Sequence, residues 1–408
     1  MSGTPQGSVW RQPPQVWAVA FACVVAFMGI GLVDPILPAI ADSLQASPVE
    51  TELLFTSYLL VTGLAMLVTS WISSRIGAKR TLLLGLGLIV VFALLCAVSG
   101  SVDAVIGFRA GWGLGNALFI STALATIVGA AVGRSGAAIV LYEAALGLGI
   151  AIGPLLGGLL GEVSWRGPFF GVVVLMAIGF LAVLILVRDE GGAREPMPLS
   201  APIRALRRPA LALLAVAALF YNIGFFVLLA FSPFPLGFGA MGIGLTFFGW
   251  GAALAITSVW AAPALMRRMS RIAVILITLP LLAVDLLAAG LTVANPAGLV
   301  TCIVIGGLLL GVMNTVLTEA VMESTDLPRA VASSAYSAVR FLGGAVAPPA
   351  AAALAHAFGD TVPYLFAATS VLIAVLTVAA GHRALAGADE TGGDVPDDGE
   401  AILIGDAA

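Results

Sequence analysis

Long apolar runs, separated by short polar or charged segments, recur along most of the 408-residue chain. Each run is long enough to cross the hydrocarbon core of a bilayer as an α-helix, which takes about 20 residues. None shows the period of two that marks a membrane β-strand. The pattern predicts twelve membrane-spanning helices, near residues 16–39, 53–73, 81–99, 104–131, 137–160, 167–187, 209–232, 241–266, 272–294, 296–319, 331–357 and 362–381.

The composition excludes a water-soluble enzyme. Hydrophobic residues make up 60% of the chain and charged residues only 10%, and the mean hydropathy is +1.10. Soluble domains carry about 25% charged residues, so this chain lacks the polar surface that such a domain needs. We expect an all-α polytopic membrane protein. Its three cysteines lie singly in different spans, which predicts small buried side chains and neither a disulfide framework nor a metal site.

Basic residues predict the orientation, because loops retained in the cytosol carry the excess of Lys and Arg. Fifteen of the 18 basic residues fall on one side of the predicted arrangement. Arg166 falls in a loop on the other side, and Arg109 and Arg340 fall inside spans. We therefore expect both termini in the cytosol.

A polar segment rich in Arg and Pro separates six spans from six. The expected division is a cytosolic N-terminal segment at 1–15, a six-helix bundle at 16–188, a cytosolic linker at 189–208, a second six-helix bundle at 209–384 and a tail at 385–408. The tail contains seven acidic residues and no basic one. That composition is typical of a disordered extension.

An internal repeat supports two related halves. Residues 58–75 of span two and 250–267 of span eight are both apolar runs that close in Arg at the same spacing. Spans five and eleven each contain a Gly- and Ala-rich stretch that ends in proline, at 147–154 and 341–348. The pattern favours two copies of one six-helix unit.

Span five contains the sequence Gly149-x-x-x-Gly153-Pro154-x-x-Gly157-Gly158. Glycines four residues apart share one helix face, where a neighbouring backbone can approach closely. A proline within the span interrupts the helical hydrogen bonds. The motif therefore predicts a tight and bendable helix contact.

Three further motifs have recognisable spacings. The loop after span two reads Ser70-Trp-Ile-Ser-Ser74-Arg75-Ile-Gly77-Ala-Lys79-Arg80, span four contains Gly107-Phe-Arg109-Ala-Gly-Trp-Gly, and span one ends in Asp34-Pro-Ile-Leu-Pro38. Together with the span-five motif, they resemble the major facilitator superfamily, and within it the twelve-helix drug:proton antiporters and bacterial multidrug efflux proteins.

The resemblance implies two six-helix bundles, an exporter and a prokaryotic cell membrane. It covers about residues 16 to 383. In the loop, Arg75, Gly77 and Lys79 match the family pattern, and Arg80 follows them. Ser70 and Ser74 stand where the family usually has Gly and Asp. This chain therefore lacks the carboxylate of the charge pair that is attributed to that Asp. The resemblance also implies a role in proton transfer for the arginine of span four.

Ionisable residues inside the predicted spans are candidates for proton coupling. A charged side chain at mid-membrane costs at least about 2.5–3.5 kcal/mol, so such residues usually face a cavity or a partner. Asp34 and Arg109 both lie toward the outer ends of their spans and are candidates to share one vestibule. A carboxyl group that alternates between water and a buried site can change its proton occupancy. We predict Asp34, Arg109 and Glu143 as proton-coupling residues; Asp285 and Arg340 receive no such assignment.

Aromatic side chains are candidates for the substrate surface, because apolar walls with an acidic group suit lipophilic and often cationic compounds. The alternative for more than half of them is ordinary packing. The predicted substrate-binding residues are Asp34, Tyr58, Tyr142, Tyr221, Phe225 and Tyr336.

The sequence thus predicts a secondary active exporter that exchanges protons for small lipophilic or amphipathic compounds by alternating access. A dedicated exporter of one metabolite, such as a sugar, siderophore or lipid-linked compound, is the alternative. A Gly-x-Ser-Gly match at Ser135 lies in a basic turn, far along the chain from His356 and His382, so we expect no enzyme. We expect a monomer that engages protons, a small substrate and the bilayer, with no cofactor, metal or nucleic acid.

Overall fold

A computed structural model describes residues 12–32, 36–130, 135–188 and 196–385. Within these ranges the regular elements are all helices. The first half of the chain forms α1 (Pro14–Gly31), α2 (Leu37–Leu44), α3 (Pro48–Ile76), α4 (Ala78–Val98), α5 (Val102–Ala130), α6 (Ser135–Gly161) and α7 (Gly167–Leu186).

The second half begins after a short helix in the expected linker, α8 (Ala201–Ala205). Two of its long helices contain one π-helical turn each, η2 (Val227–Phe231) and η3 (Thr257–Ala261), in which the hydrogen bonds span five residues. The α-helices are α9 (Pro209–Phe226), α10 (Pro233–Leu236), α11 (Ala240–Ile256), α12 (Ala262–Met266), α13 (Arg271–Leu291), α14 (Pro296–Glu323), α15 (Arg329–Phe358) and α16 (Thr361–Ala380).

Eleven spans within the described residues are long and apolar enough to cross a membrane, and the shorter apolar segment Pro14–Gly29 precedes them. The first predicted helix differs from the structure, because α1 ends at Gly31 whereas we expected a helix to residue 39. A new helix, α2, begins at Leu37, with Pro38 in its first turn. Proline fits there because the first turn leaves its backbone N–H groups unbonded in any case.

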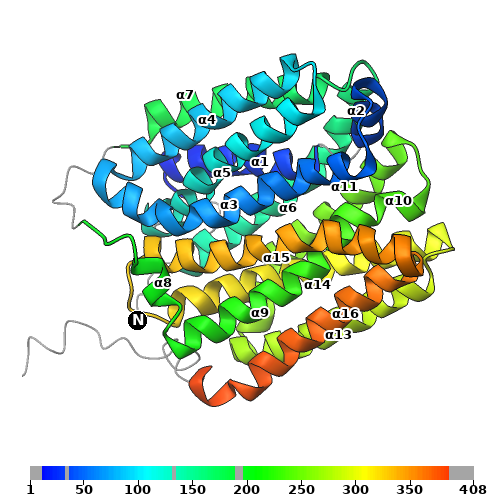
Figure 1. Cartoon of the computed structure of the whole chain (residues 1–408). Coiled ribbons are helices and arrows are strands. Elements are labelled where there is room, and N and C mark those ends of the chain that lie inside the picture. The colour runs from blue at the N-terminus through cyan, green and yellow to red at the C-terminus, as the bar shows by residue number, and fades with distance from the viewer. Residues whose placement is uncertain (1–11, 33–35, 131–134, 189–195, 386–408) are drawn as a thin grey trace, which may run out of the picture.

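The helices form two groups (Figure 1). In the first half α5 packs on α3 and α4, and α1 packs on α6; in the second, α13 packs on α16 and α9 on α15. The most extensive contacts between the groups are those of α6 with α11 and of α3 with α15, and α5 with α15 and α6 with α14 add smaller ones. This architecture confirms the expected helical fold. The exact domain limits and the cytosolic position of the termini stay predictions.

The glycine motif of α6 packs against α1, within the first half. Methyl groups on Gly149, Gly153 and Gly157 would collide with backbone carbonyl oxygens of α1, those of Val24, Met28 and Leu32 respectively. The Pro154 ring, in the same helix, packs against Gly31. Only glycine permits this approach of two backbones. The role of the motif in export stays a prediction.

Candidate transport site

A buried acidic side chain lies between the two halves. Glu143 of α6 is fully buried, and its Oε1 accepts a hydrogen bond of 2.8 Å from the Thr318 hydroxyl of α14. The same oxygen lies 3.7 Å from Nη1 of Arg340 on α15. The second oxygen, Oε2, has no hydrogen-bond partner among the described residues. One carboxyl group of the first half thus contacts two helices of the second.

Polar side chains of the second half surround this ion pair. Asn222 Nδ2 donates a 2.6 Å hydrogen bond to the carbonyl oxygen of Arg340, and the Tyr221 hydroxyl donates to Oδ1 of Asn314. All these side chains are buried. We call Glu143, Thr318, Arg340, Tyr221, Asn222 and Asn314 the interhalf cluster. A low-dielectric setting strengthens the hydrogen bonds that form and makes an unpaired group costly.

Arg109 lies in a separate place, inside the first half. Its Nε donates to the Leu54 carbonyl at 3.2 Å, and its Nη1 lies 3.4 Å from the Gly29 carbonyl. The guanidinium carbon is 4.5 Å from the ring centroid of Tyr58 and 5.0 Å from that of Trp112. Arg109 therefore ties α5 to α1 and α3. Asp34, its expected neighbour, lies outside the described residues, so their shared vestibule stays a prediction.

The predicted substrate aromatics divide between these two places. Tyr142, Tyr221 and Tyr336 lie close enough to Arg340 and Glu143 to interact with their charges, whereas Tyr58 lies beside Arg109. Phe225 packs on Phe226 and Trp250. All five predicted aromatic side chains are buried, with at most 3% of each residue exposed. A substrate can reach them only after the helices separate.

Arg340 is the important residue that the sequence analysis did not assign. Thr318 and Asn314 were also missed, although they stand four residues apart on one face of α14. Tyr336 and Arg340 have the same spacing on α15. That pairing of polar faces on two spans is the signal in the sequence. Asp285 of α13 is buried too, with its Oδ2 next to Gly306 of α14, so the protein interior surrounds it.

One end of the interface between the halves is bridged by hydrogen bonds. Arg329 Nη1 at the start of α15 donates to the Val128 carbonyl near the end of α5, at 3.0 Å. The Ser333 hydroxyl donates to the Ser121 carbonyl at 3.1 Å. The halves are therefore in contact at the end of the molecule that the basic loops predict to be cytosolic.

The loop motif at residues 70–80 contacts the linker. Gly77 has a φ of 91°, which glycine adopts without strain, and it joins α3 to α4. Arg75 stacks on Trp71 at 4.2 Å and donates to the Met197 carbonyl at 3.2 Å. The Ser74 hydroxyl accepts a 3.0 Å hydrogen bond from the Met197 N–H. Ser74 thus binds the linker backbone from the position where the family usually has Asp.

Comparison with known proteins identifies the family. The sequence profile of the Major Facilitator Superfamily matches residues 19–348. This chain belongs to the Major Facilitator Superfamily. The superfamily consists of transporters rather than enzymes, and this member is a multi-pass membrane protein. No group of three or more metal-binding side chains occurs in the part of the chain that the structure describes.

Two known proteins are similar to this superfamily member, one in sequence and one in fold. It is 52% identical over 376 residues to the multidrug efflux protein YfmO of Bacillus subtilis (strain 168), covering 92% of this chain and 95% of that protein. Its fold is similar to the crystal structure of the human organic anion transporter MFSD10 (TETRAN), with a TM-score of 0.76 and 17% identity. That match covers 90% of this chain and 100% of the human one.

Proposed function

We propose that this superfamily member exports small lipophilic or amphipathic compounds in exchange for protons, by alternating access in a prokaryotic plasma membrane. Its 52% identity to a multidrug efflux protein supports the export of drugs. The observation that carries the coupling is the position of Glu143, a buried carboxyl group held between the halves by Thr318 and Arg340. Its charge contributes to the attraction between the two halves.

The proposed coupling step is the protonation of Glu143. An ionised carboxylate attracts the Arg340 guanidinium and accepts a charge-assisted hydrogen bond from Thr318. A neutral carboxyl group keeps the hydrogen bond and loses the ion pair. Protonation therefore weakens the contact of α6 with α14 and α15. The separated helices would expose Tyr142, Tyr221 and Tyr336 to a substrate.

Asp34 and Arg109 keep the roles that the sequence suggests. In this proposal Asp34 is the first proton carrier, Glu143 assists it, and Arg109 tunes the first half by holding α1, α3 and α5 together. Proton entry from outside favours release of the substrate there. Inward movement of one elementary charge contributes about 2.3 kcal/mol per 100 mV of membrane potential.

A dedicated metabolite exporter is the second candidate. Asn222 Oδ1, Asn314 Nδ2 and Glu143 Oε2 are buried atoms of the interhalf cluster without a hydrogen-bond partner among the described residues. A fixed set of donors and acceptors can reject compounds that fail to pair with it. That arrangement favours a single polar substrate over many lipophilic ones.

Proteoliposomes that contain a pH-sensitive dye test the proposal. We expect chemically unrelated lipophilic cations to evoke proton movement with the wild-type protein, and Asp34→Asn to remove this response. A response to one polar metabolite alone would favour the second candidate. Substrate flux that ignores the pH gradient would refute proton coupling.

Replacement of Arg340 tests the ion pair separately from transport. Arg340→Gln leaves the Glu143 carboxylate buried without its cation, and breaking a buried pair in this way costs about 3–5 kcal/mol of stability. Adding Glu143→Gln should restore much of that loss, because no isolated charge then remains. Thermal unfolding in detergent measures both changes.

The matched control is Arg271→Gln. Arg271 pairs with Glu319 at 2.9 Å, but both side chains are partly exposed, which predicts a cost of about 0–1 kcal/mol. Additive effects of Glu143→Gln and Arg340→Gln would show that the two side chains do not interact in the folded protein.

A further inference from the structure

A pocket of about 370 Å³ lies where the first half meets the linker. It is bounded by the starts of α1, α4 and α15, the ends of α3, α5 and α7, and the linker. The basic loops predict that this end of the molecule lies in the cytosol. The pocket is separate from the interhalf cluster, because Glu143 and Arg340 do not line it.

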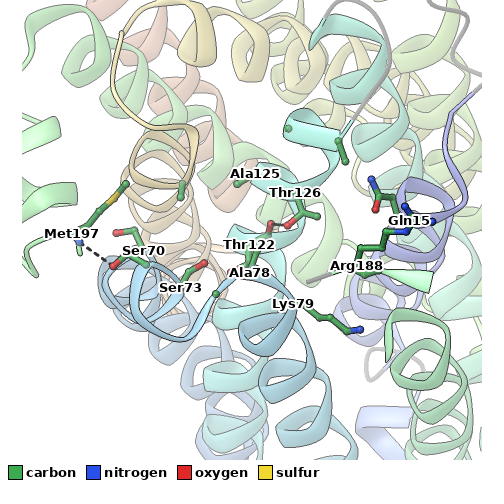
Figure 2. A pocket seen from close by; sticks show the side chains of 16 residues that line it. Gln15, Ser70, Ser73, Ala78, Lys79, Thr122, Ala125, Thr126, Arg188 and Met197 are labelled. Carbon is green, nitrogen blue, oxygen red and sulfur yellow. Dashed lines mark hydrogen bonds between the residues drawn. The ribbon is translucent and has the colours of Figure 1, made fainter. Parts of the chain in front are cut away.

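The lining of the pocket is basic and rich in hydroxyl groups. Lys79 and Arg188 contribute positive charge, and Figure 2 shows Thr122 between Arg188 and Ser70 in this view. No acidic residue belongs to the described lining. The pocket therefore favours an anion over a cation.

Two of the hydroxyl groups point to a ligand. Ser70 and Thr122 are 1% and 3% exposed, and neither hydroxyl oxygen has a hydrogen-bond partner among the described residues. A buried polar group without a partner costs free energy, which an acceptor in the pocket would recover. Thr126, in contrast, already donates to the Thr122 carbonyl at 2.7 Å.

We propose that this pocket binds a phosphate group, carried by an anionic lipid or free in the cytosol. Hydroxyl groups and cations are the donors that phosphate oxygens accept from, and arginine adds a planar fork. The cytosolic leaflet is the face where basic residues meet anionic lipids. The volume exceeds that of a bare phosphate and leaves room for the glycerol part of a lipid headgroup.

Occupation of the pocket is linked to the conformation described above. Met197 and Ala330 complete its lining. Met197 belongs to the linker segment held by Ser74 and Arg75, and Ala330 follows the Arg329 that bridges to α5. A bound phosphate group contacts the linker and both halves at once, so it stabilises the state in which this end is bridged.

The test uses the purified full-length protein in neutral detergent, with thermal unfolding as the readout. The probes are inorganic phosphate and dioctanoyl phosphatidylglycerol, with phosphate-free dioctanoylglycerol and sodium chloride of equal ionic strength as references. We expect a saturable rise in Tm with a phosphate-bearing probe and none with the references. A rise with inorganic phosphate identifies the free ion as sufficient, and a rise with the lipid alone identifies a headgroup.

Variants distinguish phosphate binding in the pocket from nonspecific attraction to positive charge. Ser70→Ala combined with Thr122→Val, and Lys79→Gln by itself, should each weaken binding by about tenfold, because each removes donors to the phosphate oxygens. Arg207→Gln removes one charge from an exposed linker residue outside the pocket and should leave binding unchanged. The basal Tm of the hydroxyl variant should equal or exceed that of the wild type, since those buried groups lack partners. No shift with either probe, or equal shifts in all variants, would overturn the site.

Discussion

Replacement of Glu143 by Gln is expected to abolish transport driven by the proton gradient. Glutamine keeps the shape of the side chain and still accepts the hydrogen bond from Thr318. It never carries the charge that attracts Arg340. Because 100 mV contributes about 2.3 kcal/mol per charge, loss of one coupled proton lowers substrate accumulation by up to about fiftyfold. Accumulation in inverted membrane vesicles, with and without an uncoupler, measures the change.

Glu319→Gln is the matched control for this experiment. Glu319 follows Thr318 on α14, but it pairs with Arg271 at a partly exposed place and does not belong to the interhalf cluster. We expect it to retain uncoupler-sensitive accumulation. If Glu143→Gln accumulated substrate to the wild-type level, and the uncoupler still abolished that accumulation, Glu143 would have no part in the coupling step.

Replacement of Gly153 by Val is expected to prevent correct assembly of the first half. A Cβ added at residue 153 would collide with the carbonyl oxygen of Met28. A backbone atom in a neighbouring helix cannot move aside as a side chain can. Overpacking of a tight contact costs about 1–3 kcal/mol, and contacts with backbone belong to the upper part of that range. The yield of monodisperse protein and its Tm measure the effect.

Gly107→Val is the control for the helix propensity of valine. It shows whether the loss in Gly153→Val comes from the contact of α1 with α6 or from a general intolerance of these helices to β-branched residues. Gly107 is also helical, but a Cβ there meets no atom within 4 Å. We expect yield and Tm close to those of the wild type. Equal losses for both variants would show that helix propensity, rather than the approach of α1 to α6, explains the result.

The helices could be predicted from the sequence because the bilayer imposes their length and apolarity residue by residue. A span such as 241–266 coincides with the observed one, Met241–Met266. The break after Gly31 was not predicted, because the span was assigned from apolarity alone, although Pro35 and Pro38 are a signal in the sequence that favours a helix end there. Hydropathy reports burial in lipid, and it does not report backbone direction.

The site was only partly predictable. An acidic residue inside a span is visible in sequence, so Glu143 was proposed. Its partners are 175 and 197 residues away, on helices that meet α6 only in the folded protein. Arg340 was set aside because nothing local distinguishes an interface anchor from a counter-ion. The glycines of α6 predicted a close helix contact, but the identity of the neighbour, α1, required the structure.

The two π-helical turns distinguish the second half from the first in the part of the chain that the structure describes. Both lie in the second half, in the helices that run through η2 and η3, whereas α3, the counterpart of the η3 helix in the repeat, is α-helical over its whole length. A π-helical turn holds an extra residue that can be passed along a helix at little cost in hydrogen bonds. When the bundles rock, we expect the second half to flex by shifting these turns.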